Sequence, residues 1–329
     1  MEIVVIDPGY DSYAYEQRLF EENGFVFEVF MGHHHDRESK IAFAANAVGV
    51  FVRWTDVDDS FLSQLPKLKA IVRYGVGYDN IDLIATSRHG VRVANVQSYA
   101  NNAVSDHALA LLLGCSRLLS LGQRSLRNNF GKPPAQDVME LTDKTLGIVG
   151  LGRIGGTFCR KAKPIFQRIL AVDPYIPADR FSLLGARPCD FQTLLKESDA
   201  ISIHCNLTQE TRSLFGSSAF AMMVKRPILV NTARGPIVEI EPLIEALVQG
   251  KIHSAGIDVF PEEPPGEHMQ SLLSNPRVIA TGHYAWYSIR SSQVLQMRAA
   301  DNLLALLRGD DVEDELPEKN VYQQIRSSQ

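Results

Sequence analysis

The sequence predicts an α/β fold with two parallel-sheet domains. Short apolar runs of strand length alternate with helical stretches along the chain, which is the pattern of parallel strands covered by helices. A chain of 329 residues is long enough for about two domains, on a prior of roughly 150 residues each. A glycine-rich motif lies near the middle of the chain and marks one of the two sheets.

The expected strands fall into two groups. In the first hundred residues they lie at 3–6, 25–30, 49–52, 70–73 and 92–94, with helices such as 13–22 between them. No glycine fingerprint occurs there, so this sheet is of a different kind from the second. The second group lies at 144–150, 169–173, 200–204, 228–231, 254–257 and 278–281, and an amphipathic helix at 291–308 and a polar tail follow.

One further helix is expected between the two groups, at residues 105–121. It is too apolar all round for a surface helix of a globular protein, so it suits a hinge or a subunit contact. Such a helix is consistent with a homodimer.

The glycine motif has the spacing of a dinucleotide site. A buried strand at 144–150 runs into Gly150-Leu-Gly152-Arg-Ile-Gly155 and a helix, and the next strand ends on Asp173. Gly150 permits the tight turn, Gly152 lets a pyrophosphate approach the backbone, and Gly155 lets helix and strand pack closely. The free N–H groups and the positive end of the helix then bind the phosphates.

Asp173 favours NAD over NADP. A carboxylate at the end of the second strand accepts hydrogen bonds from the ribose hydroxyls and repels a 2′-phosphate. The next residues, Pro174, Tyr175 and Ile176, supply no cation for that phosphate. The alternative is an Asp that only caps a turn, since Asp-Pro is a common turn dipeptide; the two roles are compatible.

Composition indicates an ordinary cytoplasmic globular protein. The chain is 45% hydrophobic and 22% charged with a net charge of −5, which argues against nucleic acid or an anionic membrane as a partner. The N-terminus has no signal-peptide pattern, and no apolar run is long enough to span a membrane. No metal site is expected, because His33-His34-His35 reads as a solvated loop and the cysteines have no metal spacing: Cys115, Cys159, Cys189 and Cys205.

Three polar residues each follow a strand of the second sheet: Arg234, Glu263 and His283. The carboxyl ends of parallel strands meet at one edge, so the fold should bring these loops together. Reduction of a ketone by hydride needs a cation to bind the substrate, an acid to protonate the alkoxide, and a partner that keeps the acid protonated. Each residue alone has an ordinary structural explanation, but their joint placement favours a catalytic site.

Long ordered motifs then resemble one family, the D-isomer-specific 2-hydroxyacid dehydrogenases. The resemblance covers nearly the whole chain, and its matching segments include 73–82, 102–108, 150–155, 204–208, 231–235 and 256–264. The resemblance implies that Arg234 binds the substrate, Glu263 keeps the histidine protonated and His283 is the acid/base. It also implies a cofactor domain at residues 101–287, inserted into a discontinuous substrate domain at residues 1–100 and 288–329.

The resemblance extends to the binding residues. The backbone around Gly75 and Gly77 is implied to bind the substrate carboxylate, with Tyr74 and Val76 in the same segment, and Asp258 to hold the nicotinamide amide. The implied cofactor-binding set is Gly150, Gly152, Arg153, Ile154, Gly155, Asp173, His204, Cys205, Asn206, Thr208, Thr232, Ala233, Asp258 and Val104.

A closer similarity is to the C-terminal binding protein and phosphoglycerate dehydrogenase-like branch. Trp286 after the histidine and Arg73 before the glycine segment are implied to lie in the substrate pocket. There are departures: the family usually has Pro where this chain has Gly282, and a bulky Tyr284 follows the histidine. The long corepressor tail and the regulatory extension of longer phosphoglycerate dehydrogenases are not present, which favours a plain enzyme.

Two other functions stay open at this point. One is an NAD(H)-sensing corepressor-like protein with weak activity, for which residues 51–54 would form a peptide groove. The other is a formate dehydrogenase, which Glu263 argues against because those enzymes resemble this one with Gln at that position. The leading hypothesis is reduction of a 2-ketoacid to a 2-hydroxyacid, and Trp286 and Tyr284 suggest an apolar or thioether substrate side chain.

Overall fold

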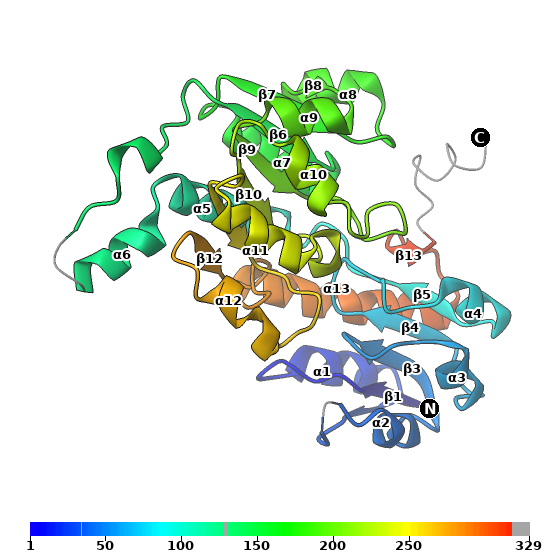
Figure 1. Cartoon of the computed structure of the whole chain (residues 1–329). Coiled ribbons are helices and arrows are strands. Elements are labelled where there is room, and N and C mark those ends of the chain that lie inside the picture. The colour runs from blue at the N-terminus through cyan, green and yellow to red at the C-terminus, as the bar shows by residue number, and fades with distance from the viewer. Residues whose placement is uncertain (34, 128–130, 318–329) are drawn as a thin grey trace. The chain divides into compact units, whose positions relative to one another are not determined.

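The computed structural model describes residues 1–33, 35–127 and 131–317 and divides the chain into two compact units. Unit 1 comprises Met1–Tyr99 and Ser288–Gln329, two segments that are far apart in the sequence, and unit 2 comprises Ala100–Tyr287 (Figure 1). Each unit holds one sheet flanked by helices, which confirms the expected α/β class with two parallel-sheet domains.

The sheet of unit 1 has six strands in the order β13-β5-β4-β3-β1-β2. Five of them run parallel, and β13 pairs antiparallel with β5. The central strand β3 is buried along its whole length, as expected of a parallel strand covered on both faces. The strand bounds are β1 Glu2–Val5, β2 Val26–Val29, β3 Ala47–Val52, β4 Ala70–Arg73, β5 Arg92–Ala94 and β13 Glu315–Leu316.

Helices cover both faces of this sheet. On one face Phe20 of α1 packs against Phe51, and α13 lies close enough that a Cβ on Gly49 would be 3.2 Å from Leu303. The other face is covered by α2, α3 and α4, whose apolar side chains join one buried cluster. The helix bounds are α1 Ala14–Glu22, α2 Arg37–Phe43, α3 Asp59–Ser63, α4 Leu83–Arg88 and α13 Ile289–Arg308.

The sheet of unit 2 has seven strands in the order β12-β11-β10-β9-β6-β7-β8, and all its pairs are parallel. The strand order reverses between β6 and β9, and in open α/β sheets ligands bind at the carboxyl edge beside that point. The strand bounds are β6 Thr145–Val149, β7 Arg168–Val172, β8 Arg187–Pro188, β9 Ala200–Ile203, β10 Ile228–Asn231, β11 Ser254–Ile257 and β12 Val278–Ala280.

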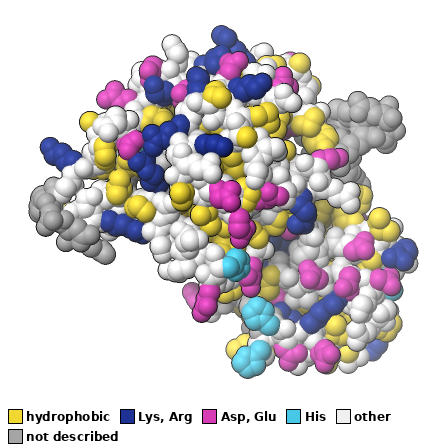
Figure 2. Space-filling view, viewed as in Figure 1, with side chains coloured by type: hydrophobic (Ala, Val, Ile, Leu, Met, Phe, Trp, Pro, Cys, Tyr) yellow, Lys and Arg dark blue, Asp and Glu magenta, His cyan; other side chains and the backbone are white. Residues whose placement is uncertain are grey.

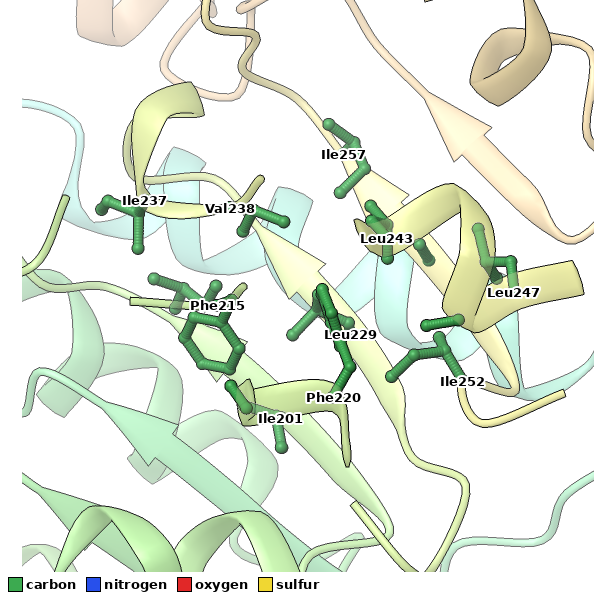
Figure 3. Close-up of a cluster of buried hydrophobic side chains, with 14 of the residues drawn as sticks. Ile201, Phe215, Phe220, Leu229, Ile237, Val238, Leu243, Leu247, Ile252 and Ile257 are labelled. Carbon is green, nitrogen blue, oxygen red and sulfur yellow. The ribbon is translucent and has the colours of Figure 1, made fainter. Parts of the chain in front are cut away.

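Two buried clusters fix the helices of unit 2 to the faces of its sheet. One contains side chains of α5, α7 and α8, and the other contains those of α9 to α12 together with Ile201, Leu229 and Ile257 of the strands (Figure 3). The helix bounds are α5 Asn101–Ser116, α6 Leu119–Arg127, α7 Arg153–Ala162, α8 Ala178–Leu184, α9 Phe191–Glu197, α10 Ser217–Met222, α11 Ile240–Val248 and α12 Gln270–Leu273, with short 3₁₀ turns η1 Ala135–Asp137, η2 Gly235–Ile237 and η3 Glu267–Met269.

The single helix expected at 105–121 is in fact two helices. The break falls at Leu118, which adopts a left-handed φ of 50° between α5 and α6. Leu111, Leu112 and Cys115 of α5 are buried in the core of unit 2, so packing within the unit accounts for the apolar sequence. Within the described residues no single helix is long and apolar enough to cross a membrane; α5 and α6 reach that length and composition only as a pair bent by 57°.

The end of the chain also differs from expectation. Residues 315–316, expected to belong to a polar tail, form the edge strand β13 of unit 1. The Arg92 guanidinium donates from Nε and Nη2 to both carboxylate oxygens of Glu315, each at 2.8 Å. This bidentate pair and two backbone pairings hold the strand in place.

Candidate active site

The glycine turn of unit 2 has the shape that a dinucleotide pyrophosphate requires. Gly150 follows β6 with φ +89°, a conformation that side chains rarely adopt. A Cβ on Gly155 would lie 2.0 Å from the Gly150 carbonyl oxygen, so no larger residue fits there. A Cβ on Gly152 would meet nothing within 4 Å, which leaves its backbone open to a ligand. Helix α7 begins at Arg153, and its N-cap residue, Gly152, makes no side-chain capping hydrogen bond, as suits a helix end that binds an anion.

Asp173 directly follows β7 and contacts the glycine turn. Its Oδ2 accepts from the Leu151 N–H at 2.8 Å, and its Oδ1 accepts from the Tyr175 N–H at 3.0 Å. The carboxylate is half-buried and each oxygen retains room for another donor. It therefore caps its own turn and braces the phosphate-binding turn, a contact that the sequence did not predict.

His204 and Cys205 lie under the glycine turn. The His204 ring packs on Phe158 at 4.8 Å between centroids, and its Nε2 is 2.9 Å from Ser202 Oγ. Burial lowers the pKa of His204 to about 3 and raises the pKa of Cys205 to about 12, so both side chains are uncharged. The Cys205 backbone N would lie 2.6 Å from a Cβ on Gly150, which is a second reason for glycine there.

The remaining expected cofactor residues also lie in unit 2. The segment from Asn206 to Thr211 closes on itself, because Thr211 Oγ1 donates to the Asn206 carbonyl at 2.6 Å and accepts from the Thr208 N–H at 2.7 Å. Val104 is buried on α5. Thr232 Oγ1, just after β10, is buried without a hydrogen-bond partner among the described residues. An unused buried hydroxyl fits a site that a polar ligand completes.

The loop that carries Arg234 is built tightly onto its neighbour. Asn231 holds the turn by donating from Nδ2 to the Arg234 carbonyl at 2.9 Å and accepting from the Ala233 N–H at 3.0 Å. A Cβ on Gly235 would lie 2.0 Å from the carbonyl carbon of Phe260, so the two loops touch backbone to backbone. The half-buried Arg234 side chain is thus positioned next to the loop that carries Glu263.

Glu263 and His283 form a direct pair. Glu263 Oε2 lies 2.6 Å from His283 Nδ1, and Oε1 accepts from the Phe260 N–H at 3.0 Å. Burial alone raises the pKa of Glu263, but the hydrogen bond and charge of His283, the Phe260 N–H and the charge of Arg234 outweigh it and lower the pKa overall. The side chains of His283 and Glu263 are 38% and 36% exposed, so a substrate can reach them.

Asp258 holds the loop that presents His283. Its carboxylate is completely buried, and it accepts from Thr281 Oγ1 at 2.5 Å, from the Tyr284 N–H at 3.2 Å and from the Ala285 N–H at 3.0 Å. His107 of α5 approaches the same group, with Nε2 2.9 Å from Thr281 Oγ1. Neither His107 nor Thr281 was identified from the sequence.

The expected substrate segment of unit 1 follows β4. Gly75 has φ +141°, and Arg73 Nη1 folds over it to donate to the Tyr74 carbonyl at 3.1 Å. The Val76 carbonyl accepts from Asn95 Nδ2 at 2.6 Å, which fixes the turn before Gly77. The Tyr74 side chain is only 2% exposed, so in this segment Tyr74 offers a ligand its backbone and not its ring.

The aromatic residues considered from the sequence lie in different environments. Trp286 is half-buried in unit 2, with its ring 5.4 Å from that of Tyr287. Phe51 and Val52 are fully buried in β3, so residues 51–54 do not form a peptide groove. Only Trp54 of that segment is substantially exposed, at 45%, and the Arg53 guanidinium lies 4.2 Å from the centre of its ring.

The surface carries charges of both signs, interspersed over the visible face (Figure 2). Across the described ranges 1–33, 35–127 and 131–317, no group of three or more His, Cys, Asp or Glu side chains is placed to hold a metal ion. His34, part of the histidine run considered above, lies outside those ranges. The side chains and backbone groups of unit 2 that could bind a cofactor or react therefore lie in the glycine turn and in the loops after β10, β11 and β12.

Comparison with known proteins agrees with this geometry. Residues 109–285 match the family model described as D-isomer specific 2-hydroxyacid dehydrogenase, NAD binding domain. A glyoxylate reductase of Thermococcus litoralis is 36% identical over 261 residues, covering 77% of this chain and 78% of that protein. A D-3-phosphoglycerate dehydrogenase of Archaeoglobus fulgidus is 34% identical over 290 residues; the match covers 88% of this chain but 54% of that relative's length.

Solved structures show the same architecture. The D-lactate dehydrogenase of Aquifex aeolicus, complexed with NAD and lactic acid, superposes with a TM-score of 0.83 at 26% identity, covering 94% of this chain and 96% of that one. The family model spans the glycine turn and the loops of Arg234, Glu263 and His283. This chain belongs to the D-isomer specific 2-hydroxyacid dehydrogenase family, in its phosphoglycerate dehydrogenase-like branch, and unit 2 contains the family's NAD-binding domain.

Proposed function

We propose that this protein is an NAD(H)-dependent D-2-hydroxyacid dehydrogenase that works as a 2-ketoacid reductase. The observation that carries the proposal is the 2.6 Å contact between Glu263 and His283, next to the Arg234 loop and in the same unit as the NAD-binding turn. The relatives named glyoxylate reductase, phosphoglycerate dehydrogenase and D-lactate dehydrogenase all act on short 2-hydroxy or 2-keto acids, which supports this substrate class.

His283 is the proposed proton donor. When bound, NADH supplies the hydride that reduces the ketone carbon. Nδ1 of His283 is engaged by Glu263, which leaves Nε2 to give its proton to the forming alkoxide and to be recharged from water. The Glu263 carboxylate stabilises the imidazolium that this step requires, because an opposite charge in contact favours the protonated ring. In the reverse direction neutral His283 takes the hydroxyl proton.

Arg234 is the proposed substrate anchor. Its planar guanidinium can bind a ketoacid through two parallel hydrogen bonds and polarise the carbonyl for hydride attack. The tight turn around Asn231 and the contact of Gly235 with Phe260 keep this side chain at a fixed place beside the Glu263 loop. Such preorganised charge needs no rearrangement during the reaction.

The proposed cofactor domain, residues 101–287, corresponds to unit 2, and the proposed substrate domain, residues 1–100 with 288–329, corresponds to unit 1; the proposed and observed bounds differ only in the assignment of Ala100. Asp173 is the proposed ribose ligand that favours NAD over NADP, since its position after β7 and its remaining lone pairs suit that role. The N–H groups around Gly75 and Gly77 are proposed to bind the substrate carboxylate, with Arg73 and Trp286 as further substrate contacts.

Assembly and location are also proposals. A cytoplasmic homodimer is favoured by the exposed leucines of α5 and α6 and by the four free cysteines. The exposed leucines are Leu113, Leu119 and Leu126. The corepressor-like alternative loses the peptide groove expected at residues 51–54, because Phe51 and Val52 lie in the core of unit 1.

The test is turnover. Purified protein is mixed with NADH and a panel of 2-ketoacids that differ in side chain, and NADH consumption and the chirality of the product are measured. We expect NADH-dependent formation of the D-hydroxyacid from at least one member of the panel and poor turnover with NADPH. No turnover of any 2-ketoacid with either cofactor, by protein that binds NADH, would contradict the proposal.

A further inference from the structure

The loop that presents His283 has little restraint of its own. Gly282 precedes the histidine, and a Cβ there would meet nothing within 4 Å, so no atom packs against the chain in that direction. His283 itself has φ +53°, a left-handed conformation that residues with a Cβ adopt only when their surroundings impose it. Contacts from other parts of unit 2 must therefore hold the histidine in place.

Asp258 supplies most of these contacts. Its carbonyl accepts from the His283 N–H at 2.7 Å, and its carboxylate accepts from the N–H groups of Tyr284 and Ala285. Three consecutive amides of the loop are thus bound to one residue. Because the Asp258 side chain is completely buried, it keeps this arrangement only if its own charge is well solvated by hydrogen bonds.

His107 completes the hydrogen-bonding of this carboxylate. The Thr281 hydroxyl is 2.5 Å from Asp258 Oδ1, and since a carboxylate only accepts, the hydroxyl donates its single proton there. The Thr281 oxygen is then left as an acceptor for the Nε2–H of His107 at 2.9 Å. His107 Nε2 is also 3.5 Å from Asp258 Oδ1, and its ring meets the Tyr284 ring edge-on at 5.1 Å.

We propose that His107 is a positioning residue for His283, acting from α5 through Thr281 and Asp258. The inference rests on the proposed function, in which His283 must meet both Glu263 and the substrate. The hydrogen bond from His107 directs the Thr281 hydroxyl toward the Asp258 carboxylate, and the hydroxyl in turn orients that carboxylate. The carboxylate then binds the backbone N–H groups of Tyr284 and Ala285, which follow His283 in the loop. The loop around Gly282 is thus held in place by a residue of α5, which lies 174 residues before Thr281 in the chain.

Hydrogen exchange tests the structural half of the proposal without turnover. Thr281→Val removes the hydroxyl at nearly constant size, and Thr281→Ser retains it as the matched control. Loss of a hydrogen bond to a buried charge should speed amide exchange in residues 281–287 by about tenfold or more. The serine variant should resemble the wild type, as should residues 228–231 in all variants. Wild-type exchange in Thr281→Val would overturn the proposal.

A second pair of variants tests His107 itself. His107→Phe keeps a ring against Tyr284 but has no donor, whereas His107→Gln places an amide donor near the position of Nε2. We expect His107→Phe to speed exchange of the same segment and to lower kcat by about tenfold or more, because small misplacements of a reacting group are costly. His107→Gln should recover most of both effects.

The outcomes separate this proposal from the proposed function. If the wild type turns over no 2-ketoacid, the proposed function fails, while the exchange data still decide whether His107 and Thr281 hold the loop. If the wild type is active but His107→Phe keeps wild-type exchange and kcat, only the positioning role fails. A loss in His107→Phe that His107→Gln does not recover would also overturn it, since the donor would then not be the cause.

Discussion

Replacing Glu263 with Gln removes the charge from the His283 pair while keeping the size and one hydrogen-bond acceptor of the side chain. The carboxylate lies 2.6 Å from His283 Nδ1, and the same contact that lowers the pKa of Glu263 must favour the protonated imidazole by an equal free energy. Reduction needs the protonated ring, so its rate falls when the ring loses its proton. In Glu263→Gln this fall should occur at lower pH.

The size of the shift follows from the geometry. A hydrogen bond between charged groups contributes about 1.5–3 kcal/mol when shielded from water. The two side chains are 38% and 36% exposed, so solvent screening reduces this to about 1 kcal/mol. One pH unit corresponds to about 1.4 kcal/mol, so the falling limb of the reduction profile should move down by about 0.7 units.

The assay is the pH dependence of kcat/KM for 2-ketoacid reduction, followed by NADH absorbance. Glu262→Gln is the matched control, because Glu262 is an exposed neighbour of the same charge and its loss should leave the profile in place. Oxidation of the hydroxyacid requires the neutral ring, so its kcat/KM should rise with pH instead of falling. In Glu263→Gln this rise should move to lower pH by the same amount. A Glu263→Gln profile that coincides with the wild-type profile would refute the reasoning.

Three other substitutions test separate parts of the account. Arg234→Lys should lower kcat/KM by about a hundredfold or more, because a point charge cannot replace a bidentate fork; a near-wild-type value would remove Arg234 from the site. Asp173→Ala should raise the NADPH/NADH ratio of kcat/KM, whereas an unchanged ratio would leave Asp173 as a turn residue. Burial raises the pKa of Glu16 in the folded protein despite its hydrogen bonds with Gln296 and Tyr74. The protonated Glu16 side chain therefore contributes fully to the free energy of unfolding below the carboxyl pKa of the unfolded chain, and this contribution is lost as pH rises through the pKa of Glu16 in the folded protein. The Tm of the wild type relative to Glu16→Gln should therefore fall between acid and neutral pH, and a constant difference would contradict this.

Local patterns were enough to predict most of the fold. Buried parallel strands produce continuous apolar runs, so β4, β10 and β11 were expected with the bounds they have. The break at Leu118 depends on one left-handed residue inside an apolar stretch and leaves no periodic signal. The two-residue strand β13 forms through pairing with β5, more than two hundred residues away, where Arg92 meets Glu315.

The site likewise contains residues that local sequence patterns predict and residues that only the folded chain brings together. Arg234, Glu263 and His283 each follow a strand, and the rule that loops meet at the carboxyl edge of a parallel sheet was enough to associate them. His107 sits on a helix far from His283 in sequence, so only the folded chain brings it to Thr281. The available signal was a histidine that directly precedes the apolar run 108–113 of α5, where a half-buried polar ring must find a partner. The burial of the Tyr74 ring inside unit 1 was likewise not predicted, because the sequence around Gly75 indicates a backbone turn and does not say where the neighbouring side chains point.

The most direct test of the central claim is the turnover of His283→Asn compared with its binding of NADH. Asn tolerates the left-handed conformation found at this position and so preserves the loop, but it cannot transfer a proton. We predict that reduction of the best 2-ketoacid falls by about a hundredfold or more while the affinity for NADH, measured by fluorescence titration, is unchanged. Turnover close to that of the wild type would contradict the assignment of His283 as the proton donor.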